Sequence, residues 1–253
     1  MEKVTSADGT TIAYDRLGSG APLILVGGAL CDRRILMPLA EELARELEVL
    51  VYDRRGRGDS GDTPAYSVQR EVEDLSALLA AAGGSAAVYG HSSGAALTAI
   101  AASQNLPFAK VVLHEAPYGP DDAEPSDDAS AVLRLLAEGR HREAVERHLT
   151  MTGLPQHLAA EYAPQMVPAA PTLAYDYAVL DITNGSRLPE ALLAKITAPT
   201  LSLAGTASPP FMIDTARRIA TVVPTAEYAA LPDQHHVVPP EVLAPVVVDF
   251  VRR

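Results

Sequence analysis

The sequence lacks the features of secreted and membrane-spanning proteins. Cys31 is the single cysteine among 253 residues, which excludes an intrachain disulfide. No apolar run approaches the roughly 20 residues that a transmembrane helix requires, and residues 1–15 contain no apolar stretch of the kind that directs secretion. We therefore expect a cytoplasmic protein with no membrane partner.

Positive charge is also scarce. The chain has 20 Lys and Arg residues against 32 Asp and Glu residues, which gives a net charge of −12. The basic residues are scattered and form no stripe, so a nucleic-acid partner is not expected. The histidines His141, His148 and His157 lack the spacing of metal ligands, and we expect neither a metal nor a cofactor.

Short apolar runs, which are typical of buried strands, alternate with segments of helical apolar spacing along much of the chain. The Asp8-Gly9 turn predicts an opening hairpin, and short apolar runs predict strands that alternate with amphipathic helices. This order is typical of an α/β fold with a mostly parallel central sheet flanked by helices. Strands are expected at residues 4–6, 10–17, 22–26, 49–52, 86–89, 110–114, 199–204 and 226–231, and helices at 35–47, 68–82, 95–103, 211–221 and 241–253.

The alternation is interrupted after Glu115. A stretch rich in Pro and Asp follows at residues 118–130, and then come helix-like segments at 131–150 and 158–162. We interpret residues 118–195 as an inserted helical cap, with residues 1–117 and 196–253 forming the core.

The segment Gly90-His91-Ser92-Ser93-Gly94 lies between a predicted buried strand and a predicted helix. In this context the Gly-x-Ser-x-Gly pattern favours a sharp turn that holds a serine above the sheet, beside the amides of the next helix. An ordinary turn flanked by glycines is the plainer alternative, but the position between strand and helix favours Ser92 as a nucleophile.

The chain resembles the α/β-hydrolase family at four places in the same order. Gly90–Gly94 resembles the nucleophile elbow, and residues 25–29 resemble the oxyanion loop, with Gly27 where histidine is more usual. Residues 52–60 are similar to the Asp-x-Arg-Gly loop, and residues 231–241 to the terminal histidine segment. The resemblance implies an α/β-hydrolase fold, and it implies that Arg54, Arg55 and Arg57 brace a loop.

The resemblance also assigns roles to individual residues. It implies that the backbone amides of Ala29 and Ser93 form the oxyanion hole, and that His236 is the base, with His235 as the alternative. His91 adjoins the nucleophile and is expected to point elsewhere.

The expected acid is the point at which this chain departs from the family pattern. Ser208 occupies the place after the late strand where relatives usually carry Asp, and a serine cannot hold and stabilise an imidazolium as a carboxylate does. Glu115, at the carboxyl end of the strand that follows the nucleophile helix, is our predicted acid. Asp233 is expected to brace its own loop, and Asp214 to be solvated.

The combination Ser92, His236 and Glu115 predicts a cofactor-free serine hydrolase that acts on a carboxylic ester or lactone of a small, largely apolar molecule. The alternatives are a biosynthetic enzyme of the same fold, such as a cyclase, dehydratase or C–C hydrolase, and a non-catalytic ligand-binding member. The cap residues Met151, Leu154, Met166, Leu173, Tyr175 and Tyr177 line an apolar pocket or form the core of the cap. The pattern is compatible with a homodimer but does not demand one.

Overall fold

The computed structural model describes residues 1–120 and 122–253, and Asp121 of the predicted cap lies outside these described residues. Its centre is an eight-stranded sheet in the order β1-β2-β4-β3-β5-β6-β7-β8. The pairs β1/β2 and β2/β4 are antiparallel, and all the other pairs are parallel. The strands are β1 (Glu2–Thr5), β2 (Thr11–Gly18), β3 (Pro22–Val26), β4 (Glu48–Tyr52), β5 (Ala86–His91), β6 (Phe108–His114), β7 (Thr200–Gly205) and β8 (Ala226–Leu231).

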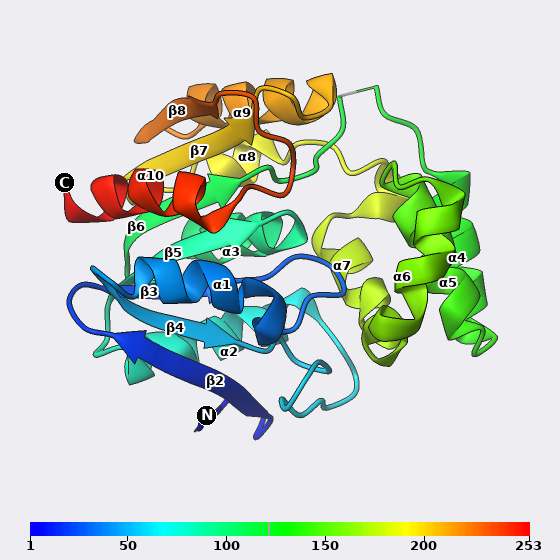
Figure 1. Cartoon of the computed structure of the whole chain (residues 1–253), viewed down its shortest axis with the longest axis horizontal. Coiled ribbons are helices and arrows are strands. Elements are labelled where there is room, and N and C mark those ends of the chain that lie inside the picture. The colour runs from blue at the N-terminus through cyan, green and yellow to red at the C-terminus, as the bar shows by residue number, and fades with distance from the viewer. Residues whose placement is uncertain (121) are drawn as a thin grey trace.

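Helices cover both faces of this sheet, so the predicted α/β-hydrolase fold with a mostly parallel sheet is confirmed (Figure 1). One face carries α1 (Arg33–Leu43) and α10 (Pro240–Arg252). The other face carries α2 (Val68–Ala81), α3 (Ser93–Ser103), α8 (Glu190–Leu193) and α9 (Pro210–Val222).

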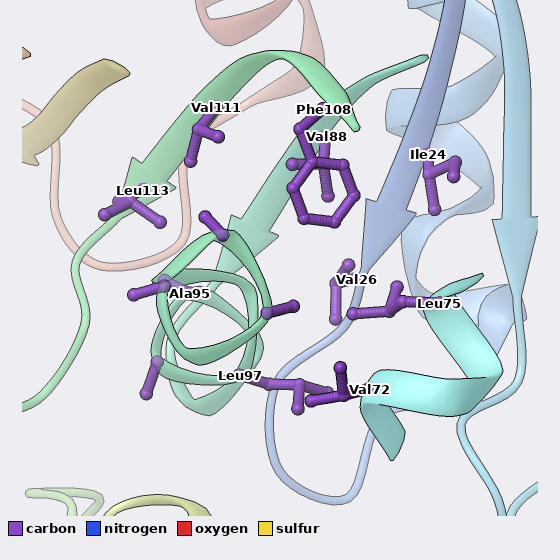
Figure 2. Close-up of a cluster of buried hydrophobic side chains, with 14 of the residues drawn as sticks. Ile24, Val26, Val72, Leu75, Val88, Ala95, Leu97, Phe108, Val111 and Leu113 are labelled. Atoms are coloured by element: carbon purple, nitrogen blue, oxygen red, sulfur yellow. The ribbon is translucent and has the colours of Figure 1, made fainter. Parts of the chain in front are cut away.

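The core follows from the two-residue period of the strands. Ile24 and Val26 of β3 pack with α2 and α3, whereas Leu23 and Leu25 pack with α1 and α10. Figure 2 shows the first of these layers, in which Leu75 of α2 lies beside Val26 of β3, and Leu97 of α3 lies beside Val72 of α2. Because both faces are covered, the interior strands are mostly apolar on both sides, with a few buried polar exceptions such as Ser202 and His114.

A helical region is inserted between β6 and β7, and Figure 1 shows it gathered at one end of the sheet. The expected helix over 131–150 is two helices, because Gly139 takes a left-handed φ of +72° that ends the first of them. The helix expected at 158–162 is longer than predicted and contains Pro164. The region contains α4 (Asp127–Ala137), α5 (His141–Met151), α6 (Gln156–Met166), α7 (Leu173–Val179) and the 3₁₀ helices Val167–Thr172 and Ile182–Asn184.

Candidate active site

The turn between β5 and α3 projects Ser92 from the carboxyl end of the sheet. Ser92 has φ 57° and ψ −126°, which is unusual for a residue with a side chain. A Cβ at Gly90 would lie 2.5 Å from the carbonyl oxygen of Gly94, and a Cβ at Gly94 would lie 2.4 Å from that of Val26. The two glycines are therefore required by the close approach of backbone segments, and Ser92 is held in its strained conformation by the packing around it.

The loop after β3 lies against Ser92. A Cβ on Gly28 would be 3.0 Å from Ser92 Cβ and 3.5 Å from its Oγ. The backbone N–H of Ser92 donates to the carbonyl of His114 at 3.0 Å, and its Oγ makes no hydrogen bond to a described residue. The hydroxyl is thus available to a ligand, and it faces the loop that carries Ala29.

Two backbone amides beside Ser92 have no acceptor among the described residues. They belong to Ala29, in the loop after β3, and to Ser93, the first residue of α3. The N–H groups at the start of a helix have no partner within that helix and favour negative charge. The structure thus leaves two free donors on the two segments that meet at Ser92.

Glu115 and His236 are brought together although 121 positions separate them in the chain. Glu115 Oε2 lies 2.6 Å from His236 Nδ1. Its other oxygen, Oε1, accepts from the backbone N–H of Gly205 at 2.8 Å and from Ser208 Oγ at 2.6 Å. The Glu115 side chain is fully buried, while that of His236 is 31 % exposed. A carboxylate thus fixes one nitrogen of an imidazole whose other edge reaches solvent.

The surroundings of Glu115 keep its carboxyl ionised. Burial by itself would raise the pKa, but the hydrogen bonds from His236, Ser208 and Gly205 N–H outweigh it and lower the pKa to about 2. The backbone strain at Glu115, with φ 50°, is the cost of turning this side chain back toward the sheet. At neutral pH the group that faces His236 Nδ1 is therefore an anion.

Ser208, at the place where the family resemblance led us to expect an acid, supports the carboxylate at the end of the neighbouring strand. Its buried hydroxyl donates to Glu115, which the sequence pattern alone did not reveal. Asp233 contributes its backbone N–H to Thr206 Oγ1 at 2.8 Å and is exposed, and Asp214 is exposed on α9. Among the acids considered from the sequence, Glu115 is the one in contact with His236.

The loop after β8 carries His236 and is fastened to the loop after β7. The N–H of Ala207 donates to the carbonyl of Gln234 at 2.9 Å, and that of Thr206 donates to Leu231 at 2.9 Å. His235 is exposed and makes no side-chain hydrogen bond to a described residue. Of the two adjacent histidines, only His236 reaches Glu115.

His91 takes a different position from the one expected, because it turns toward His236. Its Nε2 lies 2.9 Å from the backbone carbonyl of His236, and the two rings are 4.5 Å apart between centroids. Since the carbonyl can only accept, Nε2 carries the proton. The sequence could not show this contact, because it joins β5 to a loop 145 positions away.

A third histidine lies behind this pair. His114 Nδ1 lies 2.7 Å from Tyr89 Oη, and its ring is 5.0 Å from that of His91. Burial lowers the pKa of His114 to about 4 despite the nearby Glu115 carboxylate, and burial together with the other two histidines lowers the pKa of His91 well below its usual value. Both rings are therefore neutral at pH 7, and His236 is the histidine in direct contact with an anion.

The three arginines of the Asp-x-Arg-Gly-like loop are buried in ion pairs, as expected of loop-bracing residues. Arg54 pairs with Glu71 through two hydrogen bonds of 2.7 Å, and Arg55 pairs with Asp74 in the same manner at 2.7 and 2.8 Å. Arg57 pairs with Asp176 of α7 at 2.7 Å. These residues are thus occupied with protein groups.

Several of the apolar cap residues considered from the sequence form the cap's own core. Leu173 and Tyr177 are at most 3 % exposed and pack with α4 and α5, and Met151 and Met166 pack around them. Leu30, next to Ala29, belongs to the same cluster. The cap core is therefore continuous with the loop that faces Ser92.

His148 lies inside the cap, with its Nδ1 3.1 Å from Tyr177 Oη. Within residues 1–120 and 122–253, no group of three or more His, Cys, Asp or Glu side chains is arranged to hold a metal ion. None of the described helices combines the length and the apolar character needed to cross a bilayer.

Comparison with known proteins places this chain in a family. Residues 23–247 match the model of the alpha/beta hydrolase family. The crystal structure of an alpha/beta hydrolase from Sphaerobacter thermophilus DSM 20745 is 46% identical, with a TM-score of 0.91 over 98% of this chain and 99% of that one.

Two further solved structures are more distant. A thermophilic esterase from Thermogutta terrifontis is 26% identical, with a TM-score of 0.76 over 99% of this chain and 97% of that chain. A meta-cleavage product hydrolase from Pseudomonas fluorescens IP01 is 17% identical, covers 100% and 97% of the two chains with a TM-score of 0.75, and shares the fold. On the family match and the 46% identical structure, this chain belongs to the alpha/beta hydrolase family.

Proposed function

We propose that this protein is a serine hydrolase that cleaves a carboxylic ester or lactone of a small, largely apolar molecule through an acyl-enzyme. The observation that carries the proposal is the 2.6 Å contact between Glu115 and His236, next to a strained serine turn with two free amides. Ser92 is the nucleophile, His236 the general base and Glu115 the acid that orients it.

In the first half of the reaction, Ser92 Oγ attacks the carbonyl carbon while His236 Nε2 takes the hydroxyl proton. Glu115 holds the proton on Nδ1, which leaves Nε2 free to accept, and it stabilises the imidazolium that forms. The carbonyl oxygen becomes an oxyanion and accepts from the N–H groups of Ala29 and Ser93. Collapse expels the alcohol, which takes the proton from Nε2, and leaves Ser92 acylated.

In the second half, His236 removes a proton from water, which attacks the acyl carbon, and the same two amides bind the second oxyanion. Ser92 then leaves and recovers its proton from Nε2, and the carboxylic acid is released. Every proton transfer passes through one nitrogen of His236, because the other nitrogen stays bound to Glu115.

The proposed substrate class rests on the neutral surroundings of Ser92. Ala29, which carries the free amide of the loop, and Leu30 after it are apolar, and Val237, next to His236, is 80 % exposed. The arginines beneath the site are engaged in ion pairs, so they offer no charge to a substrate carboxylate. We assign residues 118–195 as the cap that closes over this surface. The likeness to the 26% identical esterase supports ester chemistry.

The test is hydrolysis of p-nitrophenyl esters of increasing acyl length by the wild type and by Ser92→Ala. Intact-protein mass is recorded after a pulse of fluorophosphonate. We expect turnover and a single adduct from the wild type, and loss of both in Ser92→Ala. The control is Ser85→Ala, since Ser85 is exposed at the opposite end of β5 and its hydroxyl bonds only the carbonyl of Pro107.

Absence of turnover and of an adduct in the wild type would contradict the proposal. An adduct that survives in Ser92→Ala would instead contradict the assignment of the nucleophile. His236→Ala is expected to lose activity to a similar extent as Ser92→Ala, because a serine without its base is a weak nucleophile.

A further inference from the structure

Asp176 of α7 is a buried carboxylate that the proposed reaction does not use. It belongs to the cap, and its side chain is 1 % exposed. Oδ1 accepts from Arg54 Nη1 and from Ser93 Oγ, both at 2.7 Å, and Oδ2 accepts from Arg57 Nη2 at 2.7 Å. A residue of the cap is therefore bound to Ser93 of the elbow and to two arginines under the loop that carries Ala29.

The contact through Arg57 leads to the amide of Ala29. Arg57 Nη1 donates to the carbonyl oxygen of Gly28 at 2.6 Å. That carbonyl and the Ala29 N–H belong to one peptide unit, which is planar and trans, so the two groups point in opposite directions. Holding the oxygen therefore fixes the direction of the N–H. A charged donor on the oxygen also polarises the amide and strengthens the N–H as a donor.

The contact through Ser93 leads to the second amide. The Oγ of Ser93 donates to Asp176, and the backbone N–H of the same residue is one of the two free donors beside Ser92. The hydrogen bond anchors the first residue of α3 from behind. Arg54 adds weaker bonds of 3.3 Å to Ser93 Oγ and to the carbonyl of Gly27.

The buried cluster around Asp176 contains equal numbers of positive and negative side chains. Arg54 and Arg57 face Glu71 and Asp176, and all four side chains are at most 2 % exposed. Burial would raise the pKa of Asp176, but Arg57 and Arg54 outweigh it and hold the pKa below its usual value. The carboxylate is ionised at neutral pH, and its loss would leave Arg57 without its ion-pair partner.

We propose that Asp176 is a positioning residue, which orients both oxyanion amides from behind, Ala29 through Arg57 and the Gly28 carbonyl, and Ser93 through its hydroxyl. The inference rests on the proposed function, because it assigns a purpose to amides that would bind a developing oxyanion. It makes α7 of the cap a structural part of the oxyanion hole.

The test compares Asp176→Asn with the wild type. Asparagine keeps the shape of the side chain but removes the charge and places an NH₂ group against a guanidinium. We expect kcat to fall by about 10- to 100-fold, less than or similar to the roughly 10²–10³-fold loss of one whole oxyanion donor. KM is expected to change by less than about threefold, because the ground-state ester does not yet carry the negative charge.

A second readout separates orientation of the amides from a general loss of structure. An alkyl boronic acid adds to Ser92 and forms a tetrahedral anion, whereas an uncharged amide of the same shape as the ester binds as a ground-state ligand. In Asp176→Asn we expect the boronic acid to bind about 10- to 100-fold more weakly, in parallel with kcat, and the amide to bind as in the wild type.

The matched control is Asp74→Asn. Asp74 is equally buried and pairs with Arg55 of the same loop, but the other partners of Arg55 are Asp8 and the carbonyl of Arg70, which lie outside the elbow and the oxyanion loop. We expect Asp74→Asn to lower stability while it keeps wild-type kcat and boronic-acid affinity. If Asp176→Asn does not fold, Ser93→Ala removes one contact only and is expected to lower kcat about three- to tenfold.

The outcomes are distinguishable. Equal losses of kcat in Asp176→Asn and Asp74→Asn would overturn the positioning role. Unchanged boronic-acid affinity in Asp176→Asn, or unchanged kcat in Ser93→Ala, would overturn it as well. In each of these cases the serine mechanism would stand. Failure of the wild type to bind boronic acid covalently at Ser92 would overturn the proposed function and, with it, the role of Asp176.

Discussion

At the scale of single residues, the Glu115 carboxylate is held by groups at the ends of two adjacent strands. Glu115 turns back from the end of β6 with a left-handed φ, and Ser208 and the Gly205 amide after β7 donate to its far oxygen. A carboxylate that receives two donors on one side and an imidazole on the other has its orientation defined on both oxygens. The serine that replaces the usual acid is therefore a partner of Glu115.

We predict that Glu115→Gln lowers kcat by about 10²- to 10⁴-fold, because an amide neither holds the same tautomer of His236 nor stabilises its charge. The measurement is kcat for a p-nitrophenyl ester between pH 5 and 9. Glu41→Gln on the exposed side of α1 is the control. Activity within threefold of the wild type in Glu115→Gln would refute the acid assignment.

A second carboxylate at position 208 is predicted to impair the site. Ser208→Asp removes a donor from Glu115 and brings a like charge to its surroundings, so one proton is retained by the pair at higher pH. The pKa of Glu115, now lowered to about 2, would rise, and carboxyl NMR signals followed through a pH titration would show it. A carboxyl titration identical to that of the wild type would contradict this. Ser208→Ala separates the lost donor from the added charge.

Part of the site could be predicted from local sequence. Ser92 and the histidine loop sit in short motifs in which the necessary glycines and prolines are adjacent in the chain. Asp176 and His91 could not be assigned in this way, since their partners are 83 and 145 positions away. The one available signal for Asp176 is that it is the single charged residue of α7, which otherwise reads as apolar.

At the scale of elements, the turn from β5 to α3 depends on three backbone segments in close contact. Gly94 touches the end of β3, so the elbow and the oxyanion loop are fixed against each other before any side chain acts. The two-residue period of the strands and the helical period outside the cap could be predicted, because each element is buried on a defined face. The cap could not, because Gly139 divides an otherwise continuous pattern and Pro164 and Pro171 interrupt the segments that follow.

We predict that Gly94→Ala destabilises the protein by about 1–3 kcal/mol or more, because its Cβ would lie 2.4 Å from the carbonyl oxygen of Val26 and 2.6 Å from that of Gly27. Neither neighbour is a flexible side chain that could move aside. Urea unfolding measures the change. In Gly61→Ala the nearest atom would be at 3.5 Å, and we expect a change within about 0.5 kcal/mol. Equal stability of the two variants would argue against this view of the elbow.

The cap is predicted to lose stability in mild acid through His148. Burial lowers its pKa to about 4, against an ordinary value of 6.5, so the unfolded chain binds this proton first as the pH falls. Stability is therefore complete above about pH 6.5 and declines as the pH falls toward about 4. At pH 5 the loss from this one group is about 2 kcal/mol.

Urea unfolding of the wild type and of His148→Gln at pH 7.5 and pH 5 tests this prediction. We expect the advantage of the wild type over the variant to shrink by about 2 kcal/mol on acidification. A control substitution of His157, which is exposed on α6, should leave the pH dependence unchanged. An advantage that grows in acid would contradict the sign of the effect.

At the scale of the whole molecule, the strong negative charge acts on every approaching ligand. The net charge of −12 is spread over one compact chain, and the predicted α/β order, helices on both sheet faces and an insertion after β6 are all present. These features follow from composition and periodicity over long stretches of chain. The packing of the cap on the elbow does not, since it depends on a few buried ion pairs.

We predict that a negatively charged ester is hydrolysed with a kcat/KM about three- to tenfold below that of a neutral ester of the same shape at 0.01 M salt. The difference should shrink at 0.15 M salt, where the screening length falls from about 30 Å to about 8 Å. A methyl ester of the charged substrate's second carboxyl is the neutral control. A ratio that is insensitive to salt would rule out steering by the overall charge.

The bond between Asp176 and the elbow also bears on how new specificities can be built on this scaffold. An inserted segment such as the cap can be exchanged between homologues in order to change which substrates enter the site while the catalytic residues stay the same. Here the cap carries Asp176, which we propose orients the oxyanion amides. A transplanted cap without a carboxylate opposite Arg57 would therefore give a new pocket but a slower enzyme. A library that diversifies the cap while holding position 176 constant would retain more active clones than one that randomises it.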